Sequence, residues 1–111
     1  MNPGLQEFSG SYEAFDWDEA KRLRTLEERG IDFADVARFF FGRVPFYRRR
    51  ADRQGEERWQ AFGPPWDKEA GIELLSVVYT ERDDGSLCWI VSARAASAKE
   101  RENYHAELQA R

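Results

Sequence analysis

Apolar residues in the first half of the chain recur every three to four positions, the spacing of amphipathic helices. Residues 18–29 form the first predicted helix, with Asp16 as its expected N-cap and Gly30 at the position of a left-handed C-cap. A second, short helix is predicted to follow Asp32, its N-cap, and to stop at Gly42 and Pro45. The apolar residues that are expected to face inward from the two helices are Ala20, Leu23, Leu26, Phe33, Val36, Ala37 and Phe40. This pattern predicts a helical hairpin whose apolar faces need a sheet to cover them.

The pattern then changes to that of β-strands. Strands are predicted at residues 46–50, 57–63, 73–82 and 87–93, and the third is apolar enough to be central in a sheet. Residues 83–86, Asp-Asp-Gly-Ser, suit a tight antiparallel turn, and residues 63–71 form a loop. A closing helix is predicted at 98–110, where Ser97 and Glu100 form a capping box. The order α-α-β-β-β-β-α predicts an α+β domain with an antiparallel sheet of about four strands.

Length and composition place the chain in a broad class. Its 111 residues suit one domain: residues 1–13 are expected to be a tail or a short edge strand, and residues 14–111 the folded unit. No apolar run approaches the roughly 20 residues of a membrane span. The N-terminus lacks a signal-peptide pattern, and the single cysteine, Cys88, cannot form an internal disulfide. We therefore predict a cytoplasmic protein with no membrane partner.

The charge distribution is uneven. The net charge of −4 argues mildly against nucleic-acid binding, which depends on Lys and Arg. Residues 38–58, however, contain seven arginines and only three carboxylates. The sequence therefore leaves room for a local basic face on an acidic protein.

Several kinds of site lack the residues that they need. The single histidine, His105, rules out a pair of histidines for acid–base catalysis, and Cys88 has no neighbouring Cys or His in sequence for a zinc site. Neither glycine-rich phosphate-binding pattern occurs. The closely spaced aspartates are explained by a helix cap and a turn. We therefore predict no metal and no other cofactor.

Arginines at strand ends are the remaining candidates. Arg58 begins one predicted strand, and Arg82 and Arg94 end the next two, so they could gather at the rim of a sheet. A guanidinium suits phosphate because its planar fork donates two parallel hydrogen bonds. RNA supplies its own nucleophile, the 2′-hydroxyl, so such donors could promote its cleavage without metal or histidine. The alternative is that these arginines are solvated rim residues and Trp59, Tyr79 and Trp89 are core or interface residues.

Five phrases, in order along the chain, resemble those of the BrnT family of toxins. They are FDWDEAK (15–21), GIDFADV (30–36), EERW (56–59) with Gly63, VVYTER (77–82) and IVSARAASAKERENY (90–104). The resemblance spans residues 12–104. It implies a RelE-like ribonuclease fold and a metal-independent endoribonuclease that inhibits translation. It also implies neutralisation by a BrnA-like ribbon-helix-helix antitoxin, through which alone the toxin would meet promoter DNA.

The resemblance also implies site residues. Arg58, Arg82 and Arg94 are expected to donate to the phosphate and the transition state, Lys21 to be an auxiliary cation, and Glu57 to be the base for the 2′-hydroxyl. The residues expected to contact RNA are Tyr79, Arg101, Tyr104, Arg48 and Arg50. Arg48 and Arg50 belong to the basic run 48–50 and are not taken from the resemblance; the alternative is that this run is exposed and protects an edge strand.

The chain departs from the family pattern at three places. Glu28 and Arg29 stand before Gly30, where the family often has a basic residue and a histidine, and Trp89 and Ala95 stand where many members have basic residues. These losses favour a second hypothesis, an inactive interaction module that still binds an antitoxin. A third reading, an unrelated α+β domain, requires the five phrases to be a coincidence.

Overall fold

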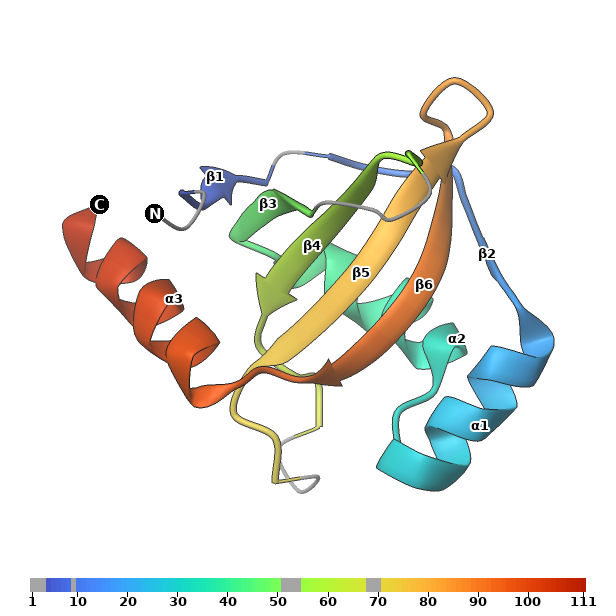
Figure 1. Cartoon of the computed structure of the whole chain (residues 1–111), viewed down its shortest axis with the longest axis horizontal. Helices are drawn as coiled ribbons and strands as arrows, with labels where there is room; N and C mark the ends of the chain where they lie inside the picture. The colour runs from blue at the N-terminus through green and yellow to red at the C-terminus, as the bar shows by residue number, and fades with distance from the viewer. Residues whose placement is uncertain (1–3, 9, 51–54, 68–70) are drawn as a thin grey trace.

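The computed structural model describes residues 4–8, 10–50, 55–67 and 71–111, and its centre is one twisted sheet (Figure 1). The strand order is β1-β3-β4-β5-β6-β2. The strands are β1 (Gln6–Glu7), β2 (Ala14–Trp17), β3 (Phe46–Arg50), β4 (Arg58–Gly63), β5 (Leu75–Arg82) and β6 (Leu87–Ala95). The helices are α1 (Glu19–Arg29), α2 (Phe33–Asp35) and α3 (Ala98–Ala110), and a π-helical turn (Val36–Phe40) and a 3-10 turn (Phe41–Arg43) extend α2.

The α+β class is confirmed, but the predicted sheet of about four antiparallel strands is wrong in number and direction. All four predicted strands are present and pair antiparallel in the order β3-β4-β5-β6. Two further strands lie at the edges: β1 pairs antiparallel with β3, and β2 pairs parallel with β6. These strands have only two and four residues, too few for an alternating pattern to stand out in the sequence. The sheet is therefore six-stranded and mixed.

Helix α1 begins one residue later than predicted and has a different cap. The Asp18 side chain, rather than that of Asp16, accepts a hydrogen bond from the Lys21 N–H. Asp16 accepts instead from the N–H of Trp17. At the other end Gly30 adopts the predicted left-handed conformation, with φ of 71°. None of the residues of α1 is buried, so this helix lies against the body without entering its core.

The second predicted helix is present in a distorted form. Asp32 caps it as predicted, accepting a hydrogen bond from the Ala34 N–H. Only three residues are α-helical before the π-helical and 3-10 turns, yet Phe33, Val36 and Phe40 still become fully buried. The wider turn lets adjacent Phe40 and Phe41 both enter the core.

Pairing across the sheet assigns alternate residues to two faces. We call the face under α2 and its following turns the helical face; its buried residues include Ala61, Leu75, Val77, Tyr79, Cys88 and Ile90. The opposite face, toward the viewer in Figure 1, we call the open face. Cross-strand pairing places there Arg48, Arg50, Arg58, Gln60, Ser76, Val78, Thr80, Arg82, Trp89, Ser92 and Arg94.

A β-bulge divides β6. Val78 pairs with Ser92, but the next residue, Tyr79, pairs with Ile90, so Val91 has no partner on β5. An extra residue reverses the alternation of a strand beyond it. Trp89 and Arg94 are an odd number of positions apart and would otherwise face opposite ways; the bulge brings both to the open face.

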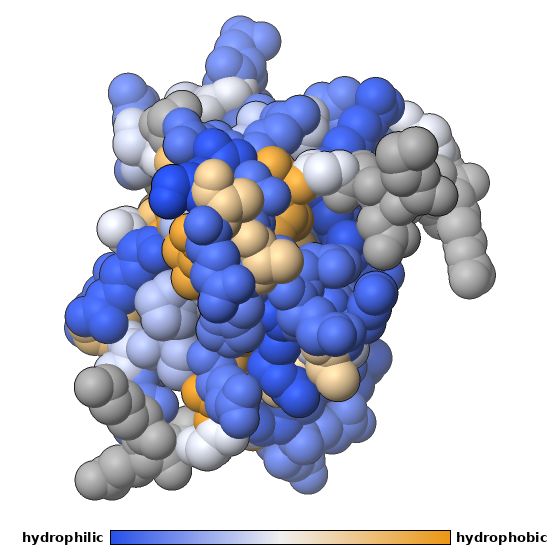
Figure 2. Space-filling model, turned by 90° about the vertical axis from the view of Figure 1, so that its left-hand side faces the viewer, coloured by the Kyte–Doolittle hydropathy of each residue, from blue (hydrophilic) through white to orange (hydrophobic). Residues whose placement is uncertain are grey.

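Helix α3 covers one end of the open face and creates a second, smaller core. Buried residues of that core are Phe46, Phe62, Leu74, Ala96 and Tyr104. The predicted capping box is confirmed, because Ser97 and Glu100 exchange their two hydrogen bonds. Seen from the α3 side, the surface is mostly hydrophilic with a small hydrophobic area (Figure 2). The rest of the open face remains uncovered by any described helix.

Candidate nucleic-acid interface

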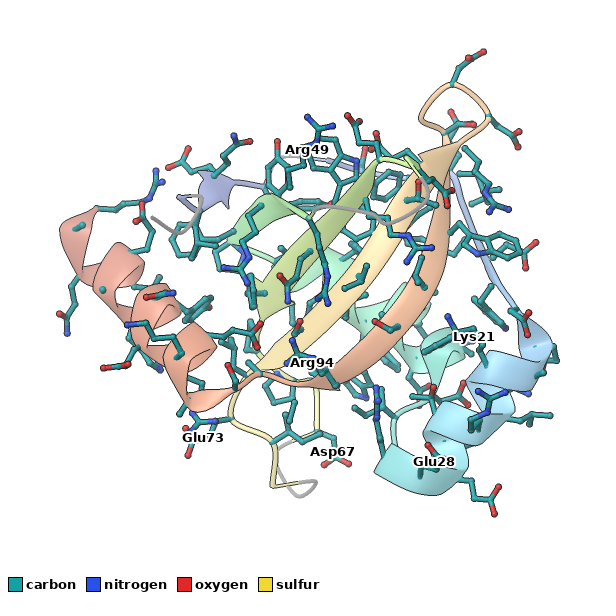
Figure 3. The ribbon with its side chains drawn as sticks, in the orientation of Figure 1. Lys21, Glu28, Arg49, Asp67, Glu73 and Arg94 are labelled. Carbon is teal, nitrogen blue, oxygen red and sulfur yellow. The ribbon has the colours of Figure 1, made fainter. Side chains whose placement is uncertain are left out.

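Five arginines from four neighbouring strands share the open face. Cross-strand pairing places Arg48 beside Gln60 and Arg50 beside Arg58 on β3 and β4, while β5 contributes Arg82 and β6 contributes Arg94. In Figure 3, Arg94 lies at the α3 end of this face. The five arginines of the open face are Arg48, Arg50, Arg58, Arg82 and Arg94. The structure thus places the three strand-end arginines on one face, together with two of the residues expected to contact RNA. Only Arg58 and Arg82 lie at the same end of that face, because Arg94 pairs with Ser76 at the opposite end of β5.

Arg82 lies on the face of the Trp89 ring. Its guanidinium carbon is 4.0 Å from the ring centroid, and its side chain is 45% exposed. A cation over an indole is attracted by the electrons of the ring, which also restricts the side chain's freedom. Trp89 therefore holds an arginine in place on the open face.

Glu56 joins Arg82 to Arg58. One Glu56 carboxylate oxygen lies 3.8 Å from Nη2 of Arg82, and the other lies 3.7 Å from Nη2 of Arg58. Arg50 is the direct cross-strand partner of Arg58. Like charges opposite each other destabilise a sheet, so a further anion at this position would be favourable.

Glu100 of α3 forms the other polar cluster of the open face. Its two oxygens accept hydrogen bonds from Arg94 at 2.7 and 2.9 Å, and one also accepts from Gln60 at 3.0 Å. Nη2 of Arg48 lies 3.5 Å from Oε2 of Glu100, and Nε of Arg48 donates a hydrogen bond to the Gln60 side-chain oxygen at 2.9 Å. The bidentate bond from Arg94 lowers the pKa of Glu100 from 4.5 to about 2. This cluster holds α3 on the sheet and fixes Arg94 and Arg48.

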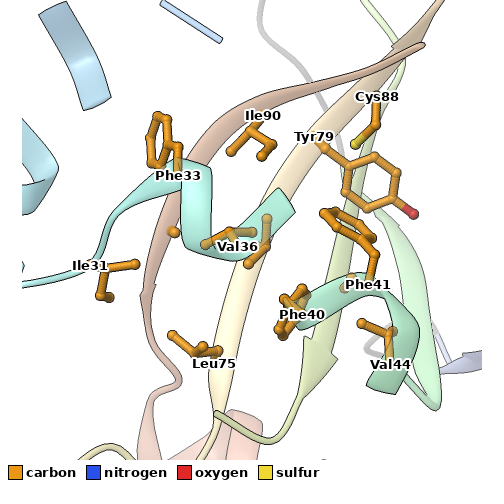
Figure 4. Close-up of a cluster of buried hydrophobic side chains, with 13 residues drawn as sticks. Ile31, Phe33, Val36, Phe40, Phe41, Val44, Leu75, Tyr79, Cys88 and Ile90 are labelled. Carbon is orange, nitrogen blue, oxygen red and sulfur yellow. The ribbon is translucent and has the colours of Figure 1, made fainter. Parts of the chain in front are cut away.

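Tyr79 lies on the helical face, away from the five arginines. It is 1% exposed and packs edge-on against Phe41, with ring centroids 5.2 Å apart (Figure 4). Burial raises the pKa of its hydroxyl well above the ordinary value. Of the alternatives that the sequence left open, the structure therefore places Tyr79 in the core.

Three other candidates also lie outside the open face. Tyr104 is buried beneath α3 against Phe46, with ring centroids 5.6 Å apart. Arg101 donates to the Ala96 carbonyl at 3.0 Å and lies 3.4 Å from Glu73. Lys21 is exposed on α1, at the far edge of the sheet from α3 (Figure 3). The first two hold α3 in position.

Glu57 and its neighbour Glu56 have different surroundings. The Glu57 carboxylate is 3.6 Å from Arg49, a residue of the helical face, while its carbonyl accepts from the Thr80 hydroxyl at 2.8 Å. Glu56 is the carboxylate that contacts two arginines of the open face. Sequence reasoning missed Glu56 because Glu56 and Glu57 both precede β4. Outside a strand, the inward–outward alternation of side chains does not say which face of the sheet a residue lies on.

Glu100 and Gln60 were also missed as parts of this surface. Glu100 was identified only as the second residue of a capping box, a role that it does fill. The signal that could have revealed more is the pair Arg94 and Glu100, which bracket the turn from β6 into α3. In the described ranges, no group of three or more His, Cys, Asp and Glu residues is placed to hold a metal ion. No helix of those ranges is long and apolar enough to cross a membrane.

Comparison with known proteins agrees with the sequence phrases. The family model for the ribonuclease toxin BrnT of type II toxin-antitoxin systems matches residues 17–100. That range begins at the end of β2, includes every strand of the open face and ends at Glu100. No individual curated protein matches the chain. The family match covers most of the 111 residues, and the chain therefore belongs to the BrnT family of ribonuclease toxins of type II toxin-antitoxin systems.

Proposed function

We propose that the open face binds RNA and cleaves it without a metal ion. The observation that carries the proposal is the gathering of Arg50, Arg58 and Arg82 on the one part of the sheet that no described helix covers. Arginine forks bind phosphate through paired hydrogen bonds, and single-stranded RNA can lie along such a surface. The BrnT family is one of ribonuclease toxins, which supports RNA as the substrate.

The chemistry requires only groups of the RNA and of this face. The 2′-hydroxyl oxygen attacks the adjacent phosphorus, the bond from phosphorus to the 5′-oxygen breaks, and the products are a 2′,3′-cyclic phosphate and a 5′-hydroxyl. Arg58 and Arg82 stabilise the extra negative charge on the phosphorane, an effect that can be worth roughly 3 kcal/mol for each donor. Arg94, held by Glu100 at the other end of the open face, binds a more distant phosphate of the same RNA strand.

Glu56 is the carboxylate that we assign to proton transfer. It contacts both Arg58 and Arg82, so a phosphate that binds these arginines also comes close to Glu56. Glu56 takes the proton of the 2′-hydroxyl, and a proton is returned to the leaving 5′-oxygen. Glu57, paired with Arg49, is the alternative base that the family resemblance suggested. Cleavage by Glu56→Gln and Glu57→Gln distinguishes the two, with loss expected only in the first.

We also propose a cellular role. We place the protein in the cytoplasm, where RNA cleavage inhibits translation and a BrnA-like ribbon-helix-helix antitoxin neutralises the toxin. Promoter DNA is contacted only through that antitoxin, and the fold is of the RelE-like ribonuclease type. The family description, a type II toxin-antitoxin system, supports the existence of an antitoxin partner.

The test is induced expression of the wild type, Arg82→Ala and Arg49→Ala in a bacterial host, with growth and total RNA followed together. Arg49 has a 69% exposed side chain on the helical face and is the matched control. Growth arrest and RNA loss are expected for the wild type and Arg49→Ala, and neither for Arg82→Ala at equal soluble protein.

The second candidate is an inactive module that binds an antitoxin. Trp89 and the pairing of the arginines with Glu56 and Glu100 favour it, because carboxylates already occupy part of the basic face. Normal growth and intact RNA with soluble, folded wild type would establish this candidate and overturn the ribonuclease proposal.

A further inference from the structure

A pocket of about 170 Å³ lies on the helical side of the sheet, away from the open face. It forms where the segment between β1 and β2 passes behind the ends of β3, β4 and β5 (Figure 1). Its lining consists of Phe8, Gly10, Tyr12, Tyr47, Trp59 and Glu81. Four aromatic side chains and one carboxylate thus make up the side-chain lining.

The aromatic rings are set at steep angles to one another. Phe8 and Tyr47 meet at 81° with centroids 5.8 Å apart, and Tyr47 and Trp59 meet at 63° with centroids 5.7 Å apart. Rings arranged in this way form walls around a space instead of a closed stack. The negative faces of aromatic rings attract organic cations, and several rings together select an ammonium or a guanidinium.

Glu81 supplies a formal negative charge to this lining. Its carboxylate accepts a hydrogen bond from the Tyr12 hydroxyl at 2.8 Å. Within the described ranges, no Lys or Arg nitrogen lies within 4 Å of it, whereas Glu56, Glu57 and Glu100 each have an arginine partner. Glu81 is exposed beside the aromatic walls and has no ion-pair partner among the described residues, so a cation can reach it from solvent without breaking an existing pair.

We propose that this pocket binds the cationic head of an arginine or lysine side chain from the antitoxin. The volume suits a head group and not a whole small molecule of drug size. The family pairs with a protein partner, which can present such a side chain. Because the pocket and the open face lie on opposite sides of the sheet, this site does not require that the toxin cleave RNA.

The first experiment measures binding of a probe to the free toxin. N-acetyl-arginine amide is titrated while the indole N–H signals of the four tryptophans are followed by NMR, with Trp59→Phe identifying the Trp59 signal. The Trp59 signal is expected to shift with a dissociation constant in the roughly millimolar range. The neutral analogue N-acetyl-citrulline amide is expected to leave it unchanged. Equal binding of both probes would overturn the proposal.

Variants test the carboxylate. Glu81→Gln keeps the size and can still accept from the Tyr12 hydroxyl, so the fold is expected to be retained. Binding of the arginine probe is expected to weaken about 10-fold, because the charge is lost. Glu57→Gln, which changes an already paired carboxylate, is the matched control and keeps wild-type affinity. Unchanged binding by Glu81→Gln would also overturn the proposal.

The complex with the cognate antitoxin distinguishes the source of the cation. If an antitoxin side chain fills the pocket, the arginine probe no longer shifts the Trp59 signal in the complex, and Glu81→Gln weakens the complex about 10-fold. A complex that still binds the probe with the affinity of free toxin would overturn the antitoxin assignment and identify a site for a free small cation. RNA cleavage by Glu81→Gln stays at the wild-type rate, so this outcome is separate from that of the ribonuclease test.

Discussion

The two faces of the sheet are made by the same strands but have opposite character. Arg48 and Arg49 are neighbours in β3, yet Arg48 joins the Glu100 cluster of the open face, while Arg49 lies with Glu57 on the other side. On β5, Tyr79 is core while Thr80 faces the arginines. The helical face buries aromatic and aliphatic side chains, and the open face gathers charge. Period-two alternation therefore separates the buried apolar side chains from the charged ones residue by residue.

Breaking the helical face has the largest expected effect. Phe40→Ala removes a fully buried ring that packs against Phe41 and lies close to Gly63. The free energy of unfolding is expected to fall by about 3–5 kcal/mol, as measured by urea denaturation. Cleavage per folded molecule should stay near the wild-type value. A loss of less than about 1 kcal/mol would contradict the role of this face as the main core.

A substitution on the open face should have the opposite effect: RNA cleavage falls, while the free energy of unfolding changes little. Arg58→Ala is expected to reduce RNA cleavage by purified protein about 100- to 1,000-fold, because a donor to the phosphorane is lost. Arg49→Ala, one strand away and on the other face, should cleave at the wild-type rate. Circular dichroism and urea denaturation check that both variants remain folded. Equal activity of Arg58→Ala and the wild type would remove Arg58 from the site.

The Glu100 cluster, where α3 covers the open face, allows a sharper test by pH. The folded pKa of Glu100, about 2, lies below its ordinary 4.5, so its charge stabilises the folded state above about pH 4.5. That contribution is lost as pH falls from about 4.5 to 2. Glu100→Gln should lower the free energy of unfolding by about 2 kcal/mol at neutral pH.

Near pH 2 most of the difference between Glu100→Gln and the wild type should be lost, since about half of the wild-type carboxyl is then protonated even in the folded state. Denaturation at several pH values measures this convergence. Glu73→Gln, at an exposed carboxylate on the same edge, is the control. A difference that is independent of pH would show that the charge of Glu100 is not what holds α3.

The smallest effect is expected from Arg50 and is best seen in its salt dependence. Arg50→Ala should weaken binding of single-stranded RNA and reduce the slope of log affinity against log salt by about 0.7. Arg49→Ala should change neither. Fluorescence anisotropy with a labelled oligonucleotide measures both slopes. Identical slopes for the two variants would mean that the two faces do not differ toward RNA.

Sequence reasoning recovered the elements whose patterns are long. The four central strands, both capped helix starts at Asp32 and Ser97, and the Gly30 C-cap are all found, because each depends on local chemistry. Strand β2 was missed because its partner, β6, is about 70 residues away in the sequence and four residues carry no clear periodicity. Pairing between distant segments is a property of the whole fold.

The candidate site was predicted in part for the same reason. The structure places Arg58, Arg82 and Arg94 on one face, but not at one rim. The C-terminal ends of β5 and β6 lie at opposite rims because the two strands are antiparallel, so Arg94 lies apart from Arg58 and Arg82. The choice between Glu56 and Glu57 could not be made, because the side of the sheet on which a loop residue lies depends on the three-dimensional path of the loop. Tyr79 could not be assigned either, since a central strand is apolar on both sides.

The bulge at Val91 changes what a mutation in β6 means. Deleting Val91 would remove the bulge and leave Trp89 and Arg94 an even number of positions apart, so both would still lie on the open face. The deletion would instead remove the local bend and the extra twist that a bulge gives a strand. A substitution in β6 is therefore assigned to a face by counting separately on each side of Val91, because residues 87 and 89 before it and residues 92 and 94 after it all lie on the open face.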